Sequence, residues 1–328
     1  MKHHIVQKAY LRQWANNGQL NIFSILENKI LERGPNWFGF WVEDYNVFEG
    51  ESGYDYAPEN VTAHIDAEGL RVIKNFEFNP LYLDGYKKSC LAFYFALQYL
   101  RTPRRRVEAN KLATATFNNL YKDNFLKSIE EDLDISKLIE EEDNIFVKEK
   151  LKAEIKGKTI EKIKSEIIEL VKENNMQLEI SNPGHSKQMM RLLDISEKLF
   201  YYKWTFLVAP KGTSFITSDS PCFISSDKEF LSGILSIGTK SYFPLRPDLC
   251  LLIESVPQKN NKEYKLVLSK NDVKEINRLV IKNSYANIIA KDSLHLKSLV
   301  SGYDFSSHKN SNDIKIYRDG DYIIFNAE

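Results

Sequence analysis

The change from helical to extended patterning along the chain most constrains its fold. Apolar residues recur at helical spacing over about 58–200, whereas short β-prone runs dominate 201–328. Two earlier β-prone runs, Leu20 to Leu26 and Lys29 to Arg33, are separated by only two residues. We therefore predict an α+β fold with an N-terminal β-hairpin, a helical middle and a mixed or antiparallel C-terminal sheet.

This patterning divides the chain into three regions, residues 1–57, 58–200 and 201–328. We expect them to form one composite domain, because polar motifs occur in all three. Pro183 and Gly184 are expected to break the helical region. Helices are predicted over about 58–76, 83–99, 107–133, 145–173, 186–200 and 270–284, and later strands over 204–208, 213–217, 241–243, 250–254, 265–268, 286–290 and 322–325.

Charge and cysteine usage exclude several classes of protein. The chain has 45 basic and 45 acidic side chains, so no net charge draws it towards nucleic acid or an anionic membrane. Cys90, Cys222 and Cys250 lie far apart, which argues against a zinc ribbon or a disulfide framework. No apolar run is long enough to cross a bilayer, and no signal-like segment opens the chain. These features predict a cytoplasmic protein with reduced thiols and no membrane partner.

The first candidate site lies at the start of the chain, where His3, Gln7 and Arg12 accompany Tyr10 and Trp14. Polar groups this dense beside large apolar side chains suggest a partly buried site. In one continuous helix His3 and Arg12 would lie on opposite faces. We therefore expect His3 in an extended lead-in and Gln7 in the first turn of a helix, a geometry that lets the three polar side chains converge. Docking of this segment by hydrogen bonds to loops is the alternative.

The second candidate lies on the helix predicted from residue 58. His64 and Glu68 are four residues apart and share a face, and Gly69 permits close approach of another segment. A His/Glu pair can act as general acid and base. An exposed ion pair explains His64 equally well, so we favour Glu68 as the site residue.

The third candidate is the arginine-rich segment that follows Gln98. Pro103 disfavours helical geometry at the preceding residue, so a kink should present the guanidinium of Arg101. Arginine binds phosphate through two parallel hydrogen bonds, which makes Gln98 and Arg101 candidate substrate or phosphate ligands. We expect Arg101 to be internal and the three arginines at 104–106 to lie mostly on the surface.

The fourth candidate ends a β-prone run at Thr217, Ser218 and Asp219, just before Pro221. A carboxylate held beside two hydroxyls at a strand end can serve as a base or a metal ligand. The same sequence also forms an ordinary Asx turn before proline. Both interpretations stay open.

Together these segments resemble the motifs of the bacterial and phage family called domain of unknown function 4238. The resemblance spans most of the chain, and it implies that the motifs contribute to a single composite site. The matching residues are His3, Gln7, Leu11, Arg12, Glu68, Gly69, Gln98, Arg101, Thr102, Pro103, Thr217, Ser218, Asp219, Pro221 and Phe243 to Leu245.

Several common active-site motifs are absent, namely the Walker lysine loop, the dinucleotide glycine motif, His-Glu-x-x-His and Gly-x-Ser-x-Gly. The leading hypothesis is a nucleic-acid-directed hydrolase, an RNase-like toxin or phage-defence effector that uses Mg²⁺ or Mn²⁺. In it His3 is general acid or base, with Glu68 or Asp219 as its carboxylate partner. Arg12 and Arg101 clamp the phosphate.

Two alternatives come from other classes of protein. In the first, the same groups form a non-catalytic nucleotide-binding or anion-binding sensor. In the second, they are a structural network that joins the regions. The sequence identifies neither a metal-ligand set nor an oligomeric state.

Overall fold

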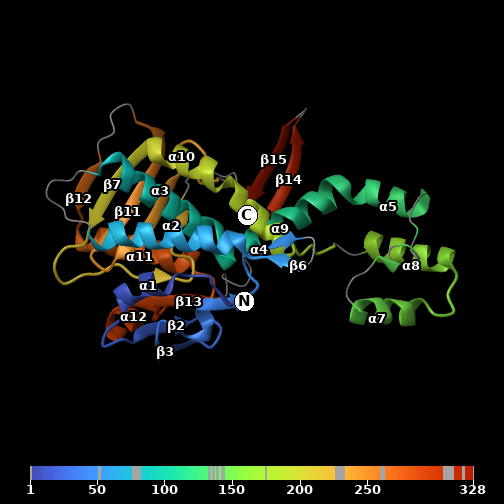
Figure 1. Cartoon of the computed structure of the whole chain (residues 1–328), viewed down its shortest axis with the longest axis horizontal. Helices are drawn as coiled ribbons and strands as arrows, with labels where there is room; N and C mark the ends of the chain where they lie inside the picture. The colour runs from blue at the N-terminus through green and yellow to red at the C-terminus, as the bar shows by residue number, and fades with distance from the viewer. Residues whose placement is uncertain are drawn as a thin grey trace. The chain divides into compact units, whose positions relative to one another are not determined.

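The fold is α+β, as predicted, with helices and several small sheets in the computed structural model (Figure 1). No helix among the described residues is long and apolar enough to cross a membrane. The structure describes residues 2–50, 53–75, 83–131, 134, 137, 140–141, 145–173, 176–225, 233–258, 263–305, 314–319 and 322–327.

Most predicted helices are confirmed, but one interruption of the helical region was not predicted and another was predicted at the wrong place. The predicted helix 145–173 is wrong as one element, because Gly157 has φ +81° and ends the first of two helices. Pro183 lies inside the first turn of a helix, where its missing N–H costs nothing. The predicted ends at residues 76 and 133 lie outside the described residues. The helices are α1 (Lys8–Leu11), α2 (Ala57–Lys74), α3 (Gly85–Leu100), α4 (Pro103–Thr116), α5 (Lys122–Glu131), α7 (Ile145–Ile155), α8 (Ile160–Glu173), α9 (Asn182–Lys187), α10 (Leu192–Tyr201), α11 (Lys270–Asn283) and α12 (Ser293–Val300), with short 3₁₀ segments at Arg12–Trp14, Phe38–Phe40 and Gln188–Arg191 and a π-helical turn at Phe117–Tyr121.

The predicted strands are largely confirmed, with one exception. The strand predicted over 213–217 is wrong except at its last residue, because 213–216 form a loop bonded to neighbouring segments. The strands are β1 (Lys2–His4), β2 (Leu20–Ser24), β3 (Lys29–Arg33), β4 (Trp41–Glu43), β5 (Phe48–Gly50), β6 (Gly53–Asp55), β7 (Tyr202–Val208), β8 (Thr217–Ser218), β9 (Phe223–Ser225), β10 (Lys240–Arg246), β11 (Leu249–Pro257), β12 (Tyr264–Val267), β13 (Asn287–Ala290), β14 (Ile314–Asp319) and β15 (Tyr322–Ala327).

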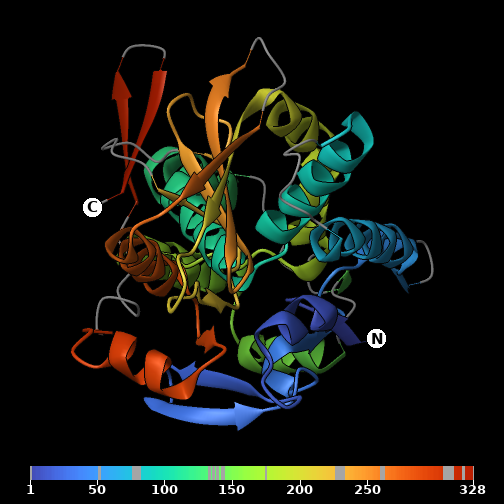
Figure 2. The same cartoon turned by 90° about the vertical axis from the view of Figure 1, so that its left-hand side faces the viewer.

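The larger sheet has five strands in the order β12-β7-β11-β10-β9. All neighbours are antiparallel except β12, which runs parallel to β7, so the sheet is mixed. Successive residues of the central strands are buried on opposite faces. Phe206 and Leu251 lie on the face of the sheet that packs against α3 and α10. Leu207 and Cys250 lie on the other face, which packs against α11. Helices therefore cover both faces of this sheet, as Figure 2 shows.

The smaller sheet has four antiparallel strands in the order β3-β2-β13-β8. Its hairpin β2-β3 is the predicted N-terminal one, and Asn28 adopts φ +50° in the turn. Pairing of β2 with β13 brings together two segments that are far apart in the sequence, and α12 packs on this sheet through Leu296 and Val300. This sheet therefore holds the N-terminal segment beside the strand that ends at Ser218.

Helices α2 and α3 approach each other closely at Gly69. A Cβ atom placed there would lie 2.3 Å from the Tyr94 ring, so any larger residue would push the helices apart. This confirms the predicted role of Gly69. It also identifies the face of α2 that is buried against α3.

The described contacts divide the chain into two compact units. One comprises residues 1–109, 180–313 and 327, and the other comprises 110–179, 314–326 and 328. The predicted boundaries after residues 57 and 200 both fall inside the first unit, and the three-region division stays a prediction. In the second unit α5 packs against α8, with Leu126 and Val171 among its buried residues. Every site residue predicted from the sequence lies in the first unit.

Candidate functional site

His3 occupies β1 and is fully buried. Its Nδ1 atom lies 2.7 Å from the backbone nitrogen of Asn46. A backbone N–H can only donate, so Nδ1 must carry the lone pair and Nε2 must carry the proton. Burial lowers the pKa of His3, although Glu59 opposes this shift. His3 is therefore a neutral hydrogen-bond donor at pH 7, and its Nε2 has no partner within the described chain.

The predicted geometry of the opening segment is confirmed in part. His3 lies in an extended lead-in, and Gln7 immediately precedes α1, one residue before the predicted first turn. The Gln7 side-chain oxygen accepts a hydrogen bond from the Tyr94 hydroxyl at 2.8 Å. Arg12 is exposed, so its side chain does not join the buried groups.

The rest of the opening segment is docked by hydrogen bonds. The Tyr10 hydroxyl donates to the Pro244 carbonyl oxygen at 2.6 Å, and it lies 2.7 Å from Thr217 Oγ1. The Trp14 indole N–H donates to the Phe215 carbonyl oxygen at 3.2 Å. Gln13 reaches the Leu245 carbonyl oxygen at 3.0 Å. We call Tyr10, Gln13, Trp14 and Thr217, with Asp219 described below, the N-terminal junction.

Arg101 is internal, as expected, and its η nitrogens bind one carboxylate. They donate to the two oxygens of Asp66 at 2.7 and 3.0 Å, and Gln98 donates to the same carboxylate at 3.0 Å. The Arg101 side chain is 3% exposed and that of Asp66 is 13% exposed. Burial lowers the pKa of Arg101, but Asp66 outweighs this and raises it overall. The Nε atom of Arg101 and Oε1 of Gln98 have no partner within the described chain.

Glu68 lies on a different face of α2 from Asp66. Its carboxylate accepts hydrogen bonds from Arg71 and from the Tyr86 hydroxyl, each at 2.7 Å. These two bonds, chiefly that of Arg71, lower the pKa of Glu68. His64 is exposed. The structure therefore places Glu68 in a surface network, away from Asp66, the carboxylate that pairs with Arg101.

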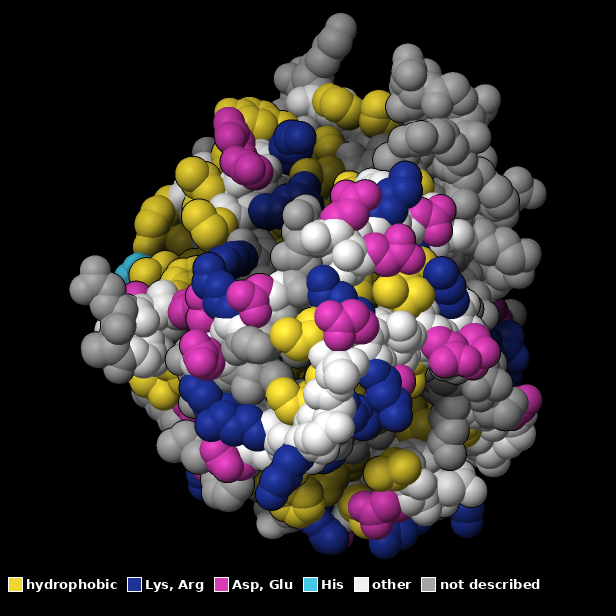
Figure 3. Space-filling view, turned by 90° about the vertical axis from the view of Figure 1, so that its right-hand side faces the viewer, with side chains coloured by type: hydrophobic (Ala, Val, Ile, Leu, Met, Phe, Trp, Pro, Cys, Tyr) yellow, Lys and Arg dark blue, Asp and Glu magenta, His cyan; other side chains and the backbone are white. Residues whose placement is uncertain are grey.

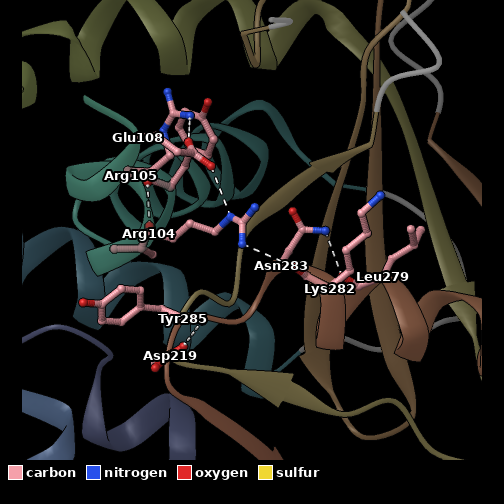
Figure 4. Close-up of polar contacts among 10 residues, drawn as sticks. Arg104, Arg105, Glu108, Asp219, Leu279, Lys282, Asn283 and Tyr285 are labelled. Atoms are coloured by element: carbon pink, nitrogen blue, oxygen red, sulfur yellow. Dashed lines mark hydrogen bonds and ion pairs between the residues drawn. The ribbon is translucent and has the colours of Figure 1, made fainter. Parts of the chain in front are cut away.

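Asp219 is buried, and backbone donors bind its carboxylate, among them the N–H of Tyr285 that Figure 4 shows. Its oxygens accept from the backbone N–H groups of Tyr285, Ala286 and Asn287 at 2.9, 2.7 and 2.8 Å. Burial raises the pKa of Asp219 to about 6, against the opposing effect of these donors. Ser218 Oγ accepts from the backbone N–H of Ser220 at 3.0 Å, so the local turn is made by Ser218 and not by Asp219 as an Asx turn would require. Asp219 therefore anchors the segment that leads into β13.

The three arginines that follow Thr102 are half-buried and engaged, so the expectation of mostly surface arginines is wrong. Arg104 reaches Glu108 at 3.1 Å and the Lys282 carbonyl oxygen at 3.3 Å (Figure 4). Arg105 pairs with Glu108 and lies over the Tyr99 ring. Arg106 lies over the Tyr45 ring, 3.3 Å from its centroid, and donates to the side-chain oxygen of Asn182 at 2.6 Å. These contacts fasten α4 to the segments before β5 and at α9.

Among the described residues, eleven buried side chains have a polar atom without a hydrogen-bond partner, and five of them are connected to one another by electrostatic interactions or through a neighbour in the sequence. His3 and Tyr45 are linked through Arg106, whose charge acts on both. The charges of Arg101 and Asp219 also act on Tyr45, and Ser220 follows Asp219 in sequence. Buried polar atoms are normally paired, so unpaired ones that lie near one another are candidates for contact with a ligand. The atoms are His3 Nε2, Tyr45 hydroxyl, Gln98 Oε1, Arg101 Nε and Ser220 Oγ, and we call these residues the polar centre.

Two members of this arrangement were missed in the sequence. Asp66 precedes Gly69 by three residues, so it shares the face of α2 that packs on α3. Gly69 therefore indicated that Asp66 lies on the buried face of α2. The spacing of His64 and Glu68 pointed instead to another face of the helix. Tyr45 lies in a loop without a motif, and no local signal identifies it.

Electrostatics and metal-ligand geometry add two findings. On the face drawn in Figure 3, Lys and Arg side chains are interspersed with Asp and Glu side chains. Among the described residues, no three His, Cys, Asp or Glu side chains are grouped as a metal site requires.

The three cysteines are free thiols, and burial raises the pKa of each.

The site defines an α+β protein whose buried polar centre is built from segments far apart in the sequence. A family model described as a protein of unknown function, DUF4238, matches residues 2–293. The chain therefore belongs to that family, which confirms the resemblance of its motifs. No curated protein and no solved structure matches the chain.

Proposed function

We propose that the polar centre binds a small anionic ligand of the nucleotide class and that recognition is its function. The observation that carries this proposal is the set of buried polar atoms without internal partners. Leaving such atoms unpaired costs about 1–3 kcal/mol each, so a ligand that pairs them recovers a large free energy. The structural-network alternative is weaker, because a structural network pairs its members.

The chemistry of these atoms favours an acceptor-rich ligand. His3 Nε2, the Tyr45 hydroxyl and Arg101 Nε are donors, and Gln98 Oε1 supplies one acceptor. The guanidinium group of Arg106 adds positive charge beside them, whereas the charge of Arg101 is paired with that of Asp66. A phosphate or carboxylate oxygen suits the donors, and an N–H or O–H of the ligand suits Gln98. A nucleotide carries both kinds of group.

Hydrolysis of a phosphodiester is a second candidate for the same site. It is favoured by the Nε2–H of His3, which could donate a hydrogen bond to a phosphate oxygen and stabilise the charge that develops there. Asp219 and Glu68, the predicted carboxylate partners, are bonded elsewhere. The acidic residues whose charges act on His3 are Glu59 and Asp44. The cytoplasmic location, the nucleic-acid partner, Mg²⁺ or Mn²⁺ dependence and a role in toxicity or phage defence stay predictions.

A calorimetric titration tests the binding proposal. AMP, GMP, CMP and UMP are titrated into the parent and into Tyr45→Phe, which removes a hydroxyl that has no internal partner. Tyr86→Phe is the matched control, because the Tyr86 hydroxyl lies in the surface network of Glu68. We expect one of the nucleotides to bind the parent and the control alike, and to bind Tyr45→Phe about tenfold more weakly.

Two results would contradict the proposal. Equal affinity of the parent and Tyr45→Phe would place any nucleotide outside the polar centre. The absence of binding heat for all four nucleotides would reject the ligand class. Incubation of the parent with RNA and single-stranded DNA, with and without Mg²⁺ or Mn²⁺, separates the second candidate, because cleavage lost in His3→Gln would require chemistry at the same site.

A further inference from the structure

A cavity of about 710 Å³ lies apart from the polar centre, between α11, α12 and the loop at 212–214. Both helices stand at the left of the view in Figure 2. This volume falls within the range typical of small-molecule sites, about 300–1,000 Å³. We call it the α11–α12 cavity. None of the polar-centre residues lines it.

One side of the α11–α12 cavity is cationic. Lys270, Lys274 and Arg278 line it, and their spacing of four residues places them on one face of α11. Arg278 also pairs with Glu275, at 2.5 Å. Neither lysine has a carboxylate partner among the described residues. Asp292 is the one acidic residue that lines the cavity, so the charge of the lining is positive.

Asp292 is engaged in capping α12. Its side chain accepts from the backbone N–H of His295 at 2.7 Å. Burial lowers the pKa of His295, so its ring is neutral at pH 7. His295 Nδ1 lies 3.2 Å from Ser214 Oγ. The hydroxyl groups of Ser298 and Ser301 also line the cavity and add neutral donors beside the three cations.

The rest of the wall is apolar and aromatic. Leu299 and Tyr303 line the cavity, and both are partly buried in the cluster of the smaller sheet. The Tyr303 ring packs on Phe305, with centroids 4.7 Å apart, which holds it in place. A ligand that fits this lining has an anionic end and a planar or apolar end.

We propose that the α11–α12 cavity binds a small phosphorylated molecule, with its phosphate against Lys270, Lys274 and Arg278 and its organic part against Tyr303. Lysine and arginine are strong phosphate ligands, and serine hydroxyls complete such sites. This site is independent of the function proposed for the polar centre.

Calorimetric titration of ADP and of pyrophosphate into the full chain tests this site. The cavity variant is Lys270→Gln with Lys274→Gln. Its matched control is Lys282→Gln with Lys297→Gln, which removes the same charge from α11 and α12 at positions outside the cavity. We expect ADP to bind the cavity variant about tenfold or more weakly, because charged hydrogen bonds are lost, and to bind the control as it binds the parent.

A third variant, Tyr303→Ala, separates the two ends of the ligand. It should weaken ADP and leave pyrophosphate unchanged, and retained pyrophosphate binding also reports an intact fold. An equal loss of ADP affinity in the cavity variant and the control would show that binding depends on the net charge of the protein and not on the cavity. That result would overturn the proposal. So would the absence of binding by both probes to the parent. ADP binding that survives in the cavity variant but is lost in Tyr45→Phe would place the nucleotide in the polar centre instead.

Discussion

The N-terminal junction and the polar centre are both buried and polar, but they differ in how their hydrogen bonds are completed. In the junction, Tyr10, Trp14 and Asp219 each bond to backbone groups within the described chain. In the polar centre, His3 and Tyr45 each keep a polar atom without a partner there. A completed network rigidifies a fold, whereas each unpaired buried polar atom costs free energy that a bound partner would recover. Buried polar residues of this protein therefore divide into those whose hydrogen bonds are completed within the described chain and those that the proposed ligand would pair.

The Asp66–Arg101 ion pair is buried, and its loss should have the largest effect. Asp66→Ala leaves the Arg101 charge buried without a partner, so we expect a loss of about 3–5 kcal/mol in the free energy of unfolding. Urea denaturation measures it. Replacing both residues, as Asp66→Leu with Arg101→Met, should recover most of the loss. A cost for Asp66→Ala no larger than that of a surface substitution would show that the pair is not buried in solution.

Asp219→Asn should have the next largest effect, because both carboxylate oxygens accept N–H groups and an amide nitrogen cannot. We expect this variant to lose about 1–3 kcal/mol in the free energy of unfolding at pH 7. Thermal or urea denaturation measures the loss. Unchanged stability would mean that Asp219 does not anchor the segment before β13 and would return it to the candidate catalytic groups.

The pH dependence of this effect has a defined sign. The pKa of Asp219 is raised from 3.8 to about 6, so the folded state holds the proton more tightly than the unfolded state. This contribution to stability is complete below pH 4 and is lost as the pH rises through 6, by about 3 kcal/mol in all. Urea denaturation from pH 4 to 7 should show that fall in the parent relative to Asp219→Asn. A difference that does not change with pH would contradict the raised pKa.

Two tyrosine variants, one in the N-terminal junction and one in the polar centre, should differ in stability by a smaller amount. Tyr10→Phe breaks contacts with Thr217 and Pro244, so it should lose about 1–2 kcal/mol in the free energy of unfolding. Tyr45→Phe removes a hydroxyl without an internal partner, so it should leave stability unchanged or slightly raised. Denaturation of both variants measures the difference. Equal losses would mean that the Tyr45 hydroxyl is paired inside the folded chain.

Glu68→Gln should have the smallest effect, because the carboxylate of Glu68 bonds to Arg71 and Tyr86 in a surface network. We expect no measurable change in melting temperature and no change in nucleotide affinity. Calorimetry and a melting curve provide both values. A loss of nucleotide binding with normal melting would restore Glu68 as a site residue.

Local patterning predicted much of the fold, because helix periodicity and hairpin spacing depend on neighbouring residues. The hairpin β2-β3 and the helices α2, α3 and α11 follow from it. The pairing of β2 with β13 does not, because it joins segments separated by most of the chain. The motifs likewise identified Arg101 as internal, but not its partner Asp66. The neutral state of His3 depends on Asn46, a contact that no sequence spacing reveals.

The protonation state of the His3 ring distinguishes ligand recognition by the polar centre from acid–base catalysis. Recognition as proposed uses a neutral ring that donates through Nε2, whereas acid–base chemistry requires a ring that titrates. Long-range ¹H–¹⁵N NMR of histidine-labelled protein reports the protonation of each ring nitrogen. At pH 7 we predict an unprotonated Nδ1 and a protonated Nε2, whose signal shifts when the nucleotide that binds in calorimetry is added. A doubly protonated ring at pH 7, or a Nε2 signal unchanged at saturating nucleotide, would contradict the account.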